Sequence, residues 1–312
     1  MSDFHPLFPQ SAAVVFYHKN CMDGFGAAWT FKKLMEEKFT AVDYIPSQYG
    51  DVPNYDLLTG KYPKSNVYIL DFSFPKQILV ELADRARHVF VLDHHKTAEE
   101  NLTNWSAEYP KPHNLEIRFD MNRSGAGLAW DFFAPPSLPR PVMISYIEDR
   151  DLWRFKMYES EAYNEYVKSL PFNFQDYDAL YHEGFANCVY LGKALRRANT
   201  KIVDSIVAAC KREIVIDSHR GLACNSFGMF ASDVGEKLAL ECGTFGASYY
   251  TSSSGDLHFS LRSRGSFDVS ALAKKFAGGG HKNAAGFVVG SDRLLETAGA
   301  LQLYSRDEGD ND

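Results

Sequence analysis

Short apolar segments that end in acidic or histidine side chains constrain the fold of this chain most strongly. Residues 89–92 are apolar and lead directly into Asp93, His94 and His95. Such a run is typical of a strand buried on both faces. Because open α/β sheets bind ligands at the carboxyl ends of their strands, these side chains would lie where that fold places its chemistry. Imidazole and carboxylate together suit Mn, Fe or Zn better than Ca. A single triplet could equally hold structural histidines.

Two earlier apolar runs end in the same kinds of side chain. Residues 12–17 precede His18 and Asp23, and residues 66–70 precede Asp71. Helical patterns follow each run, and further strands are expected at 40–45 and 114–120. Alternating strands and helices predict an α/β fold with a parallel, doubly wound sheet and right-handed crossovers. We expect His18 and Asp23 in a strand-to-helix loop, although Asp23 could instead cap the helix at 25–38.

The next segment contains two lesser candidates for function. Residues 121–130 read as a polar, glycine-containing turn that opens a helix, whose N–H groups could bind an anion or be capped by Ser124. A helix over 142–148 should end at Asp149, Arg150 and Asp151. These charged residues could also form a surface ion pair.

The C-terminal part of the chain changes in pattern. A long helix is predicted over 186–212, followed by a small mixed domain. Its strands are expected at 213–217, 221–225, 247–250 and 257–262, with a helix at 233–240.

Two arginines and a glycine run in this part could bind phosphate. Arg262 and Arg264 lie at the end of a predicted strand, and a short helix over 269–276 precedes residues 278–281, Gly-Gly-Gly-His. Glycines let backbone N–H groups approach a phosphate, and guanidinium and imidazole groups can hold its oxygens. A glycine run by itself is more often a flexible turn.

The composition restricts the class of partner and the compartment. Lys plus Arg number 33 against 40 Asp plus Glu, a net charge of −7, which argues against non-specific binding to long nucleic acid. The five cysteines form no C-x-x-C pair, which is typical of a reducing compartment. No apolar run approaches the roughly 20 residues of a membrane span, and residues 1–10 lack a signal-peptide pattern. We therefore expect a cytoplasmic protein that does not bind membranes.

Taken together, these stretches resemble the DHH phosphoesterase superfamily, in the branch with a C-terminal DHHA1 domain. They occur in the family's order along nearly the whole chain: residues 18–24, 70–71, 93–95 and 124–126, a carboxylate at Asp149 or Asp151, and residues 278–281 with 284–286. The family includes RecJ-like exonucleases, nano-RNases that degrade very short oligonucleotides, and cyclic-dinucleotide phosphodiesterases. Its members generally use two divalent ions, often Mn²⁺, with Mg²⁺ as an alternative.

The resemblance implies a role for each matching residue. Asp71 would bridge two ions, with His18 at one and Asp23, His94 and Asp149 at the other. Asp149 is preferred to Asp151 because it directly follows the apolar run. Asp93 would be a ligand or would orient a histidine. The catalytic set would be Asp71, Asp93, His94 and His95. Phosphate would be bound by His95, Arg262, Arg264, Gly279, Gly280 and His281, with Ser124 and Asn283 as lesser candidates.

One position departs from the family pattern. Cys21 stands where the first of two aspartates is expected in Cys21-Met-Asp23. Thiolate prefers Zn or Fe to Mn or Mg. Cys21 could be a ligand, could be a bystander that leaves one site short of oxygen, or could shift the choice of metal. We expect a bystander or weak ligand with activity retained.

The expected organisation is a catalytic DHH domain over 1–185, a linker helix over 186–212, a substrate-binding DHHA1 domain over 213–305 and an acidic tail over 306–312. The substrate would lie in the cleft between the domains. The predicted function is hydrolysis of phosphodiester bonds in short oligonucleotides or small nucleotides by a metal-activated hydroxide. Alternatives are a phosphomonoesterase or pyrophosphatase, or a nucleotide sensor weakened by Cys21. The sequence leaves homodimer formation open.

Overall fold

The computed structural model describes residues 11–106 and 110–290, and the backbone of 301–303. The chain divides into two compact units, Met1–Arg196 and Arg197–Asp312. The boundary falls within the long helix α8 (Phe185–Cys210), which was expected as a helix over 186–212. The acidic segment 306–312 lies outside the described residues.

The first unit contains the predicted parallel sheet. Its five strands have the order β2-β1-β3-β4-β5, and every neighbouring pair is parallel. The chain moves from β1 to β2 on one side and from β3 to β5 on the other, so the direction of winding reverses between β1 and β3. Ligands bind at such a switch point in open α/β sheets. The strands are β1 (Ala13–His18), β2 (Val42–Ser47), β3 (Asn66–Leu70), β4 (His88–Asp93) and β5 (Leu115–Phe119).

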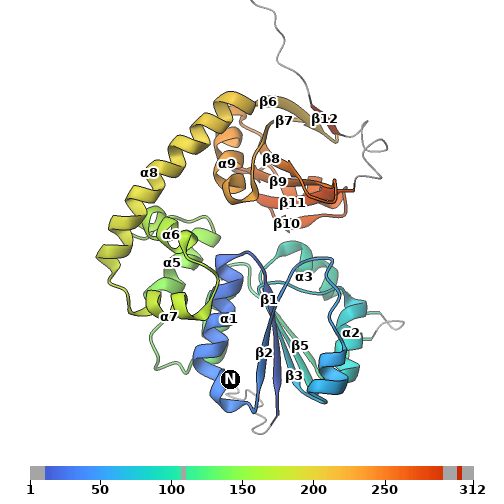
Figure 1. Cartoon of the computed structure of the whole chain (residues 1–312). Coiled ribbons are helices and arrows are strands. Elements are labelled where there is room, and N and C mark those ends of the chain that lie inside the picture. Colours follow the sequence, from blue (N-terminus) through green and yellow to red (C-terminus); the bar gives the residue numbers. More distant parts are fainter. Residues whose placement is uncertain (1–10, 107–109, 291–300, 304–312) are drawn as a thin grey trace, which may run out of the picture. The chain divides into compact units, whose positions relative to one another are not determined.

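Helices cover both faces of this sheet because successive strand residues point to opposite sides. Val15 packs with side chains of α1 (Met22–Met35) and α4 (Gly125–Phe133). Val14 and Phe16 pack instead with α2 (Lys76–Arg85) and α3 (Lys96–Thr103). Figure 1 shows α1 on one side of the sheet and α2 and α3 on the other. A 3₁₀ turn at Glu36–Lys38 follows α1, and a π-helical turn at Leu57–Lys61 precedes β3.

A second layer of helices packs against the outer side of α1 and α4. It contains α5 (Val142–Asp151), α6 (Ser160–Ser169), α7 (Phe174–His182) and the start of α8. Phe25 and Trp29 of α1 belong to this apolar cluster. A Cβ on Gly192 of α8 would lie only 1.8 Å from Ala162 O, so α8 can approach α6 this closely only with glycine there.

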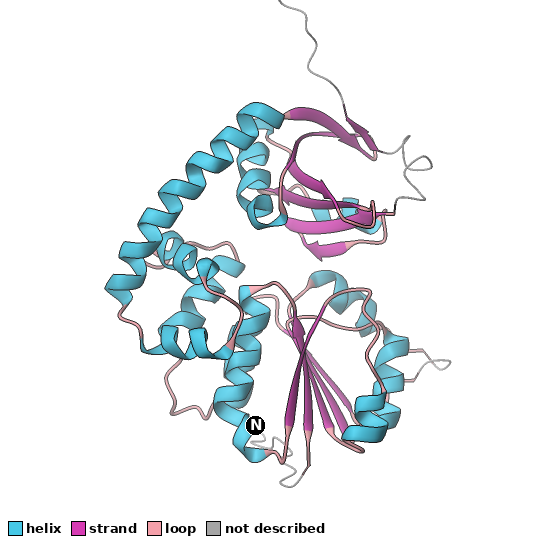
Figure 2. Ribbon diagram, in the orientation of Figure 1, coloured by secondary structure: helices cyan, strands magenta, loops and turns pink. Residues whose placement is uncertain are grey.

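The second unit is built on a mixed sheet, as predicted, with the order β10-β11-β9-β8-β7-β6-β12. β7 and β8 pair in parallel, and the other neighbours are antiparallel. Helix α10 (Val269–Lys274) packs on one face, while α8 and α9 (Ala231–Cys242) supply apolar residues to the other. The strands, magenta in Figure 2, are β6 (Arg212–Ile216), β7 (His219–Asn225), β8 (Phe245–Thr251), β9 (Leu257–Ser263), β10 (Gly279–His281), β11 (Ala284–Val289) and β12 (Leu301–Leu303).

One local expectation was wrong. Helix α1 begins at Met22, so Asp23 lies in its first turn and His18 is the last residue of β1, rather than both lying in a loop. The flexible turn considered as an alternative for the glycine run is not observed, because Gly279–His281 pairs with β11. A Cβ on Gly278 would lie 2.1 Å from Gly286 O, and Gly280 has φ +134. Glycine is therefore needed for close strand pairing rather than for flexibility.

Within the described ranges, no helix combines the length and apolar character that crossing a membrane requires.

Candidate metal centre

Asp71 lies at the centre of a buried cluster at the carboxyl end of the first unit's sheet. It directly follows β3, is 1% exposed and adopts a left-handed backbone conformation with φ +65. Its Oδ1 is 3.0 Å from His94 Nε2, and its Oδ2 is 3.4 Å from His18 Nδ1. The two oxygens of one carboxylate therefore face two different histidines, as a bridging ligand would.

Two groups of potential metal ligands meet at this carboxylate. In the first, here called the Cys21 group, ligand atoms of His18, Cys21 and Asp71 lie within 4.8 Å of one another. In the second, the Asp151 group, the same holds for Asp23, His94 and Asp151. Asp71 also adjoins the second group through its contact with His94. The convergence predicted from separate strand ends is thus present within one unit.

Buried polar atoms in both groups lack a hydrogen-bond partner. Asp71 Oδ2, His18 Nδ1 and Asp151 Oδ2 are such atoms among the described residues. Buried polar groups are nearly always satisfied, because leaving one unpaired costs free energy. A divalent cation accepts lone pairs from both carboxylate and imidazole, so ions would satisfy these atoms. The residues present therefore fit divalent metal ions.

The crowding of carboxylates in the cluster also favours binding of a cation. Burial raises the pKa of Asp23 well above its usual range, and the neighbouring carboxylates of Asp71 and Asp151 raise it further. Burial likewise raises the pKa of Asp151. Burial opposes ionisation of Asp71 too, but the neighbouring imidazoles of His18 and His94 hold its pKa well below the usual range. Without metal, the histidines are therefore the main positive groups balancing these carboxylates.

The pKa of His94 responds to the same crowding. Burial lowers it, but the three neighbouring carboxylates outweigh burial and raise it to about 10; they belong to Asp151, Asp71 and Asp23. The thiol of Cys21 has its pKa raised well above the usual range by burial and by the same carboxylates. In the metal-free protein the site therefore holds protons at positions that a metal ion would occupy.

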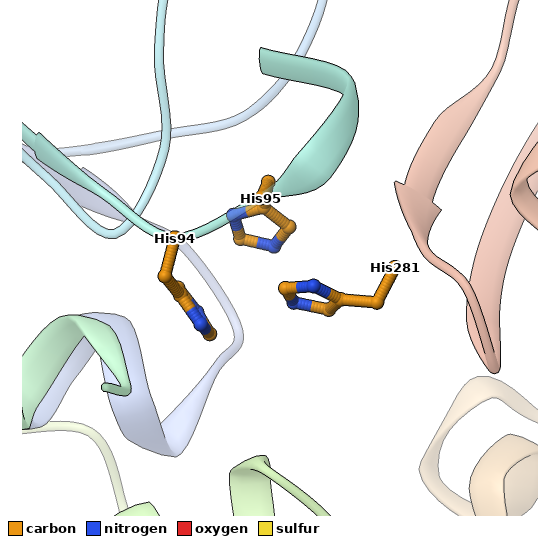
Figure 3. Close-up of side chains that lie close together, drawn as sticks. All are labelled: His94, His95 and His281. Atoms are coloured by element: carbon orange, nitrogen blue, oxygen red, sulfur yellow. The ribbon is translucent and has the colours of Figure 1, made fainter. Parts of the chain in front are cut away.

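Asp93 positions the loop after β4 rather than joining either ligand group. Its side chain is 0% exposed, and its Oδ1 accepts hydrogen bonds from His94 N, His95 N and His95 Nδ1, the last at 2.7 Å. Its Oδ2 accepts a hydrogen bond from Ser73 Oγ at 2.6 Å. Figure 3 shows His94 and His95 on this loop. Of the two roles considered for Asp93, this geometry favours orientation of a histidine.

The geometry favours Asp151 over the expected Asp149 as the candidate ligand. Asp151 Oδ2 lies 3.5 Å from His94 Nε2. Asp149 is buried and accepts hydrogen bonds from Lys156 N and Met157 N, at 3.0 and 3.3 Å. Residues two apart on a helix point about 200° apart, so only one of the two can face His94. Asp149 instead stabilises the loop that follows α5.

The predicted anion site at the start of α4 is already filled by the protein's own carboxylates. Asp23 accepts hydrogen bonds from Gly125 N and, at 2.9 Å, from Ala126 N. Ser124 N donates a hydrogen bond to Glu148, and Ser124 Oγ accepts one from Gly127 N. Ser124 is thus the N-cap of α4, and Asp23 caps this neighbouring helix rather than its own.

The candidate phosphate ligands of the second unit have partners within that unit. Arg262 donates to Ser232 Oγ at 2.7 Å, and Arg264 forms an ion pair with Glu236. Asn283 donates to Ser263 Oγ at 2.9 Å, which ties the β10–β11 turn to β9. Gly279, Gly280 and His281 form the edge strand β10, and Figure 3 also draws His281. Phosphate binding by these residues stays a prediction.

Three residues near the cluster were not expected from the sequence. Tyr49 is 46% exposed, and its ring centroid lies 5.9 Å from that of His18 and 5.8 Å from that of His95. Ser73 donates a hydrogen bond to Asp93, and buried Glu148 forms ion pairs with three arginines, Arg123, Arg140 and Arg154. For Tyr49 the only available signal was its place just after the strand β2.

Comparison with known proteins gives matches across most of the chain. Residues 229–301 match the model of the DHHA1 domain. An uncharacterized protein, R106 of Acanthamoeba polyphaga mimivirus, is 30% identical over 314 residues, covering 94% of this chain and 72% of that protein.

Two solved structures of low sequence identity are also similar. RecJ of Thermus thermophilus, in complex with Mn²⁺, has a TM-score of 0.51 and 12% identity over 93% of this chain and 51% of that chain. PggH of Vibrio cholerae, described as a pGpG-specific phosphodiesterase, has a TM-score of 0.43 and 13% identity over 93% of this chain and 96% of that chain.

Proposed function

We propose that this chain, which belongs to the DHH/DHHA1 phosphoesterase superfamily, is a divalent-metal-dependent phosphodiesterase. The substrates would be short oligonucleotides or small nucleotides. The observation that carries the proposal is the position of Asp71, whose two oxygens face His18 and His94 at 3.4 and 3.0 Å inside two ligand groups. This arrangement supports a centre for two ions joined by one carboxylate.

The ligands would divide between the two groups already described. His18 would hold one ion and Asp23, His94 and Asp151 the other, with Asp71 shared. The ions would neutralise charge on the phosphoryl oxygens and activate water for attack on phosphorus. RecJ, which has a similar fold, has been solved with Mn²⁺ and with Mg²⁺, and the oxygen-rich Asp151 group suits either ion.

His95 would bind the phosphate. Its Nδ1 is engaged by Asp93, so Nε2 is the nitrogen that can donate to a phosphoryl oxygen. Both backbone N–H bonds to Asp93 fix the same loop, which restricts the ring to few orientations. A preorganised donor of this kind stabilises charge that develops in the transition state.

We extend the proposal to the division of labour along the chain. Residues 1–185 would form the catalytic domain, 186–212 the linker helix and 213–305 the substrate-binding domain. In the last of these, Arg262, Arg264 and the Gly279–His281 strand would bind substrate phosphate. Substrate phosphate would have to displace Glu236 from its ion pair with Arg264.

Two features favour a small nucleotide-bearing substrate. The net charge of −7 disfavours tracking along long strands. The half-exposed ring of Tyr49 lies beside His18 and His95 and offers a surface on which a base can stack. Base–aromatic stacking contributes about 1–3 kcal/mol per base. A bare pyrophosphate would gain nothing from such a ring.

The test is hydrolysis of a labelled panel containing linear and cyclic dinucleotides, a phosphomonoester and pyrophosphate. Each is incubated with Mn²⁺, Mg²⁺, Zn²⁺ or EDTA. Turnover of a dinucleotide that is lost in EDTA and in Asp71→Ala is expected. Asp56→Ala is the matched control, because Asp56 is exposed and lies outside both ligand groups. Turnover of pyrophosphate alone would favour the pyrophosphatase. Nucleotide binding without turnover in the presence of any of these metals would favour the nucleotide sensor over the enzyme.

A further inference from the structure

The two ligand groups offer different donor atoms to the ions. The Cys21 group contains one sulfur, one imidazole and the shared carboxylate, whereas the Asp151 group combines two carboxylates with one imidazole. Thiolate favours Zn²⁺ and Fe²⁺, and carboxylate suits Mn²⁺ and Mg²⁺. We infer that the two sites prefer different ions, and that Cys21 Sγ binds a thiophilic ion such as Zn²⁺ or Fe²⁺ in the first. The inference rests on the two-ion centre of the proposed function.

The position of Cys21 in the fold places its sulfur next to the ligand atoms of His18 and Asp71. Cys21 is the N-cap of α1, with φ −129 and ψ 132, and its side chain makes no capping hydrogen bond. An N-cap side chain normally bonds the first turn of its own helix. The first turn of α1 packs tightly on the end of β1, since a Cβ on Gly24 would lie 2.3 Å from His18 O. This packing keeps Cys21 beside His18.

Evidence for an ion at this position does not depend on the cysteine. Asp71 is 1% exposed, and its Oδ2 has no hydrogen-bond partner among the described residues. The same is true of His18 Nδ1, which lies 3.4 Å away. Two buried lone-pair donors face each other without a hydrogen bond, and the sulfur of Cys21 lies within 4.8 Å of both residues' ligand atoms. One cation would satisfy all three.

Other cysteines of the chain show how a structural cysteine is placed. Cys188 and Cys224 are 0% exposed and belong to apolar clusters of the two units. Free cysteine generally behaves as such a small apolar side chain. Cys21 is partly exposed and lies beside a carboxylate and an imidazole instead. Its surroundings are those of a ligand rather than of a packing residue.

The experiment measures sulfur ligation directly. Metal-free full-length protein is titrated with Co²⁺, whose thiolate complexes absorb in the near ultraviolet by charge transfer, and bound cobalt is counted in parallel. Parent protein, Cys21→Ser, Cys21→Asp and the control Cys210→Ser are compared. Cys210 is also a partly exposed free cysteine, but it lies at the end of α8 and in neither ligand group. Competition between Zn²⁺ and Mn²⁺ is then measured for each protein.

The expected result is a charge-transfer band in the parent and in Cys210→Ser that is missing from both Cys21 variants. Cys21→Asp should still bind two ions, which shows that it folds, and its preference for Zn²⁺ over Mn²⁺ should fall by about tenfold or more. A band of equal strength in Cys21→Ser would overturn the inference. The inference would also be overturned if the parent protein bound two Co²⁺ ions without a charge-transfer band, or if it bound no Co²⁺. Hydrolysis is assayed separately, so a band without turnover would contradict only the proposed function.

Discussion

Asp93 Oδ1 accepts a 2.7 Å hydrogen bond from His95 Nδ1, and Asp93 is the last residue of β4 while His95 lies two residues beyond it. Burial raises the pKa of Asp93, but the interaction with His95 and the hydrogen bond from Ser73 outweigh it and lower that pKa below its usual range. The carboxylate therefore stays ionised and holds the imidazole in one tautomer. Through this pair Asp93, which lies outside both ligand groups, would influence the proposed reaction.

Asp93→Asn should lower kcat about 10–100-fold while leaving two ions bound, because it disturbs the partner of His95 and not a ligand. Steady-state kinetics and metal analysis on the same sample would check this. Ser73→Ala, which removes only the bond to Asp93 Oδ2, should have a smaller effect. Loss of one ion from Asp93→Asn would instead make Asp93 a ligand.

Asp151→Asn and Asp149→Asn should separate a ligand from a structural residue. The first removes a charge 3.5 Å from His94 Nε2 and should weaken binding of one ion by about tenfold or more. The second weakens hydrogen bonds to Lys156 N and Met157 N and should cost about 1 kcal/mol of stability with metal affinity retained. Calorimetric titration and thermal unfolding would measure the two effects. The opposite pattern would restore Asp149 as the ligand.

Gly125→Ala should impair metal binding without altering any ligand. Its Cβ would lie 2.4 Å from Asp71 Cβ and 2.5 Å from Asp71 Oδ1, so the shared carboxylate would have to move. We expect fewer than two bound ions and loss of most activity. Gly60→Ala is the matched control, since nothing lies within 4 Å of a Cβ there. Two tightly bound ions in Gly125→Ala would contradict this prediction.

Metal uptake should depend on pH through His94. Its pKa in the metal-free protein is raised to about 10, so the folded protein holds this proton above pH 6.5, where the unfolded chain releases it. The stabilisation is complete below pH 6.5 and is lost as the pH rises through about 10. Because metal must displace the proton in the folded protein, affinity should rise about tenfold per pH unit below about pH 10. Calorimetry in buffers of different ionisation enthalpy should find about one proton released from His94. Affinity that is independent of pH would contradict this.

Asp23→Ala should destabilise the protein even in EDTA. The change removes the acceptor of the N–H groups of Gly125 and Ala126, and losing a helix cap typically costs about 1–2 kcal/mol. Asp151→Ala removes a nearby carboxylate that caps no helix, so its effect in EDTA should be smaller. Denaturant unfolding of both variants without metal would measure the difference. Equal stability of the two would mean that the capping bonds contribute little.

The sequence predicted the parallel sheet and the convergence at Asp71 because apolar runs and the polar residues that end them are local patterns. It could not choose Asp151 over Asp149, since that choice depends on the rotation of α5 about its axis. Nor could it show that Asp23 caps α4, because about a hundred residues separate the bonded groups. Tyr49 follows β2 without a distinctive motif, and its value depends on neighbours from other strands.

The glycine run illustrates the same limit in the second unit. Three successive glycines are compatible with a loose phosphate loop and with a tightly paired strand, and local propensity favours the loop. Backbone contacts with Ala284 and Gly286 select the strand. Helices α6 (Ser160–Ser169) and α7 (Phe174–His182) were not predicted, because the face that α6 buries includes polar side chains such as Ser160 and Asn164, which an apolar pattern does not mark.

All ligand atoms of the Cys21 and Asp151 groups belong to residues 18–151, which lie wholly in the first unit. The residues proposed to activate water would thus belong to one segment of the chain, which is separate from residues 229–301 that match the DHHA1 domain. Substitutions in the second unit therefore leave every side chain of both ligand groups unchanged, so metal binding and substrate binding can be varied separately if the second unit binds substrate as proposed.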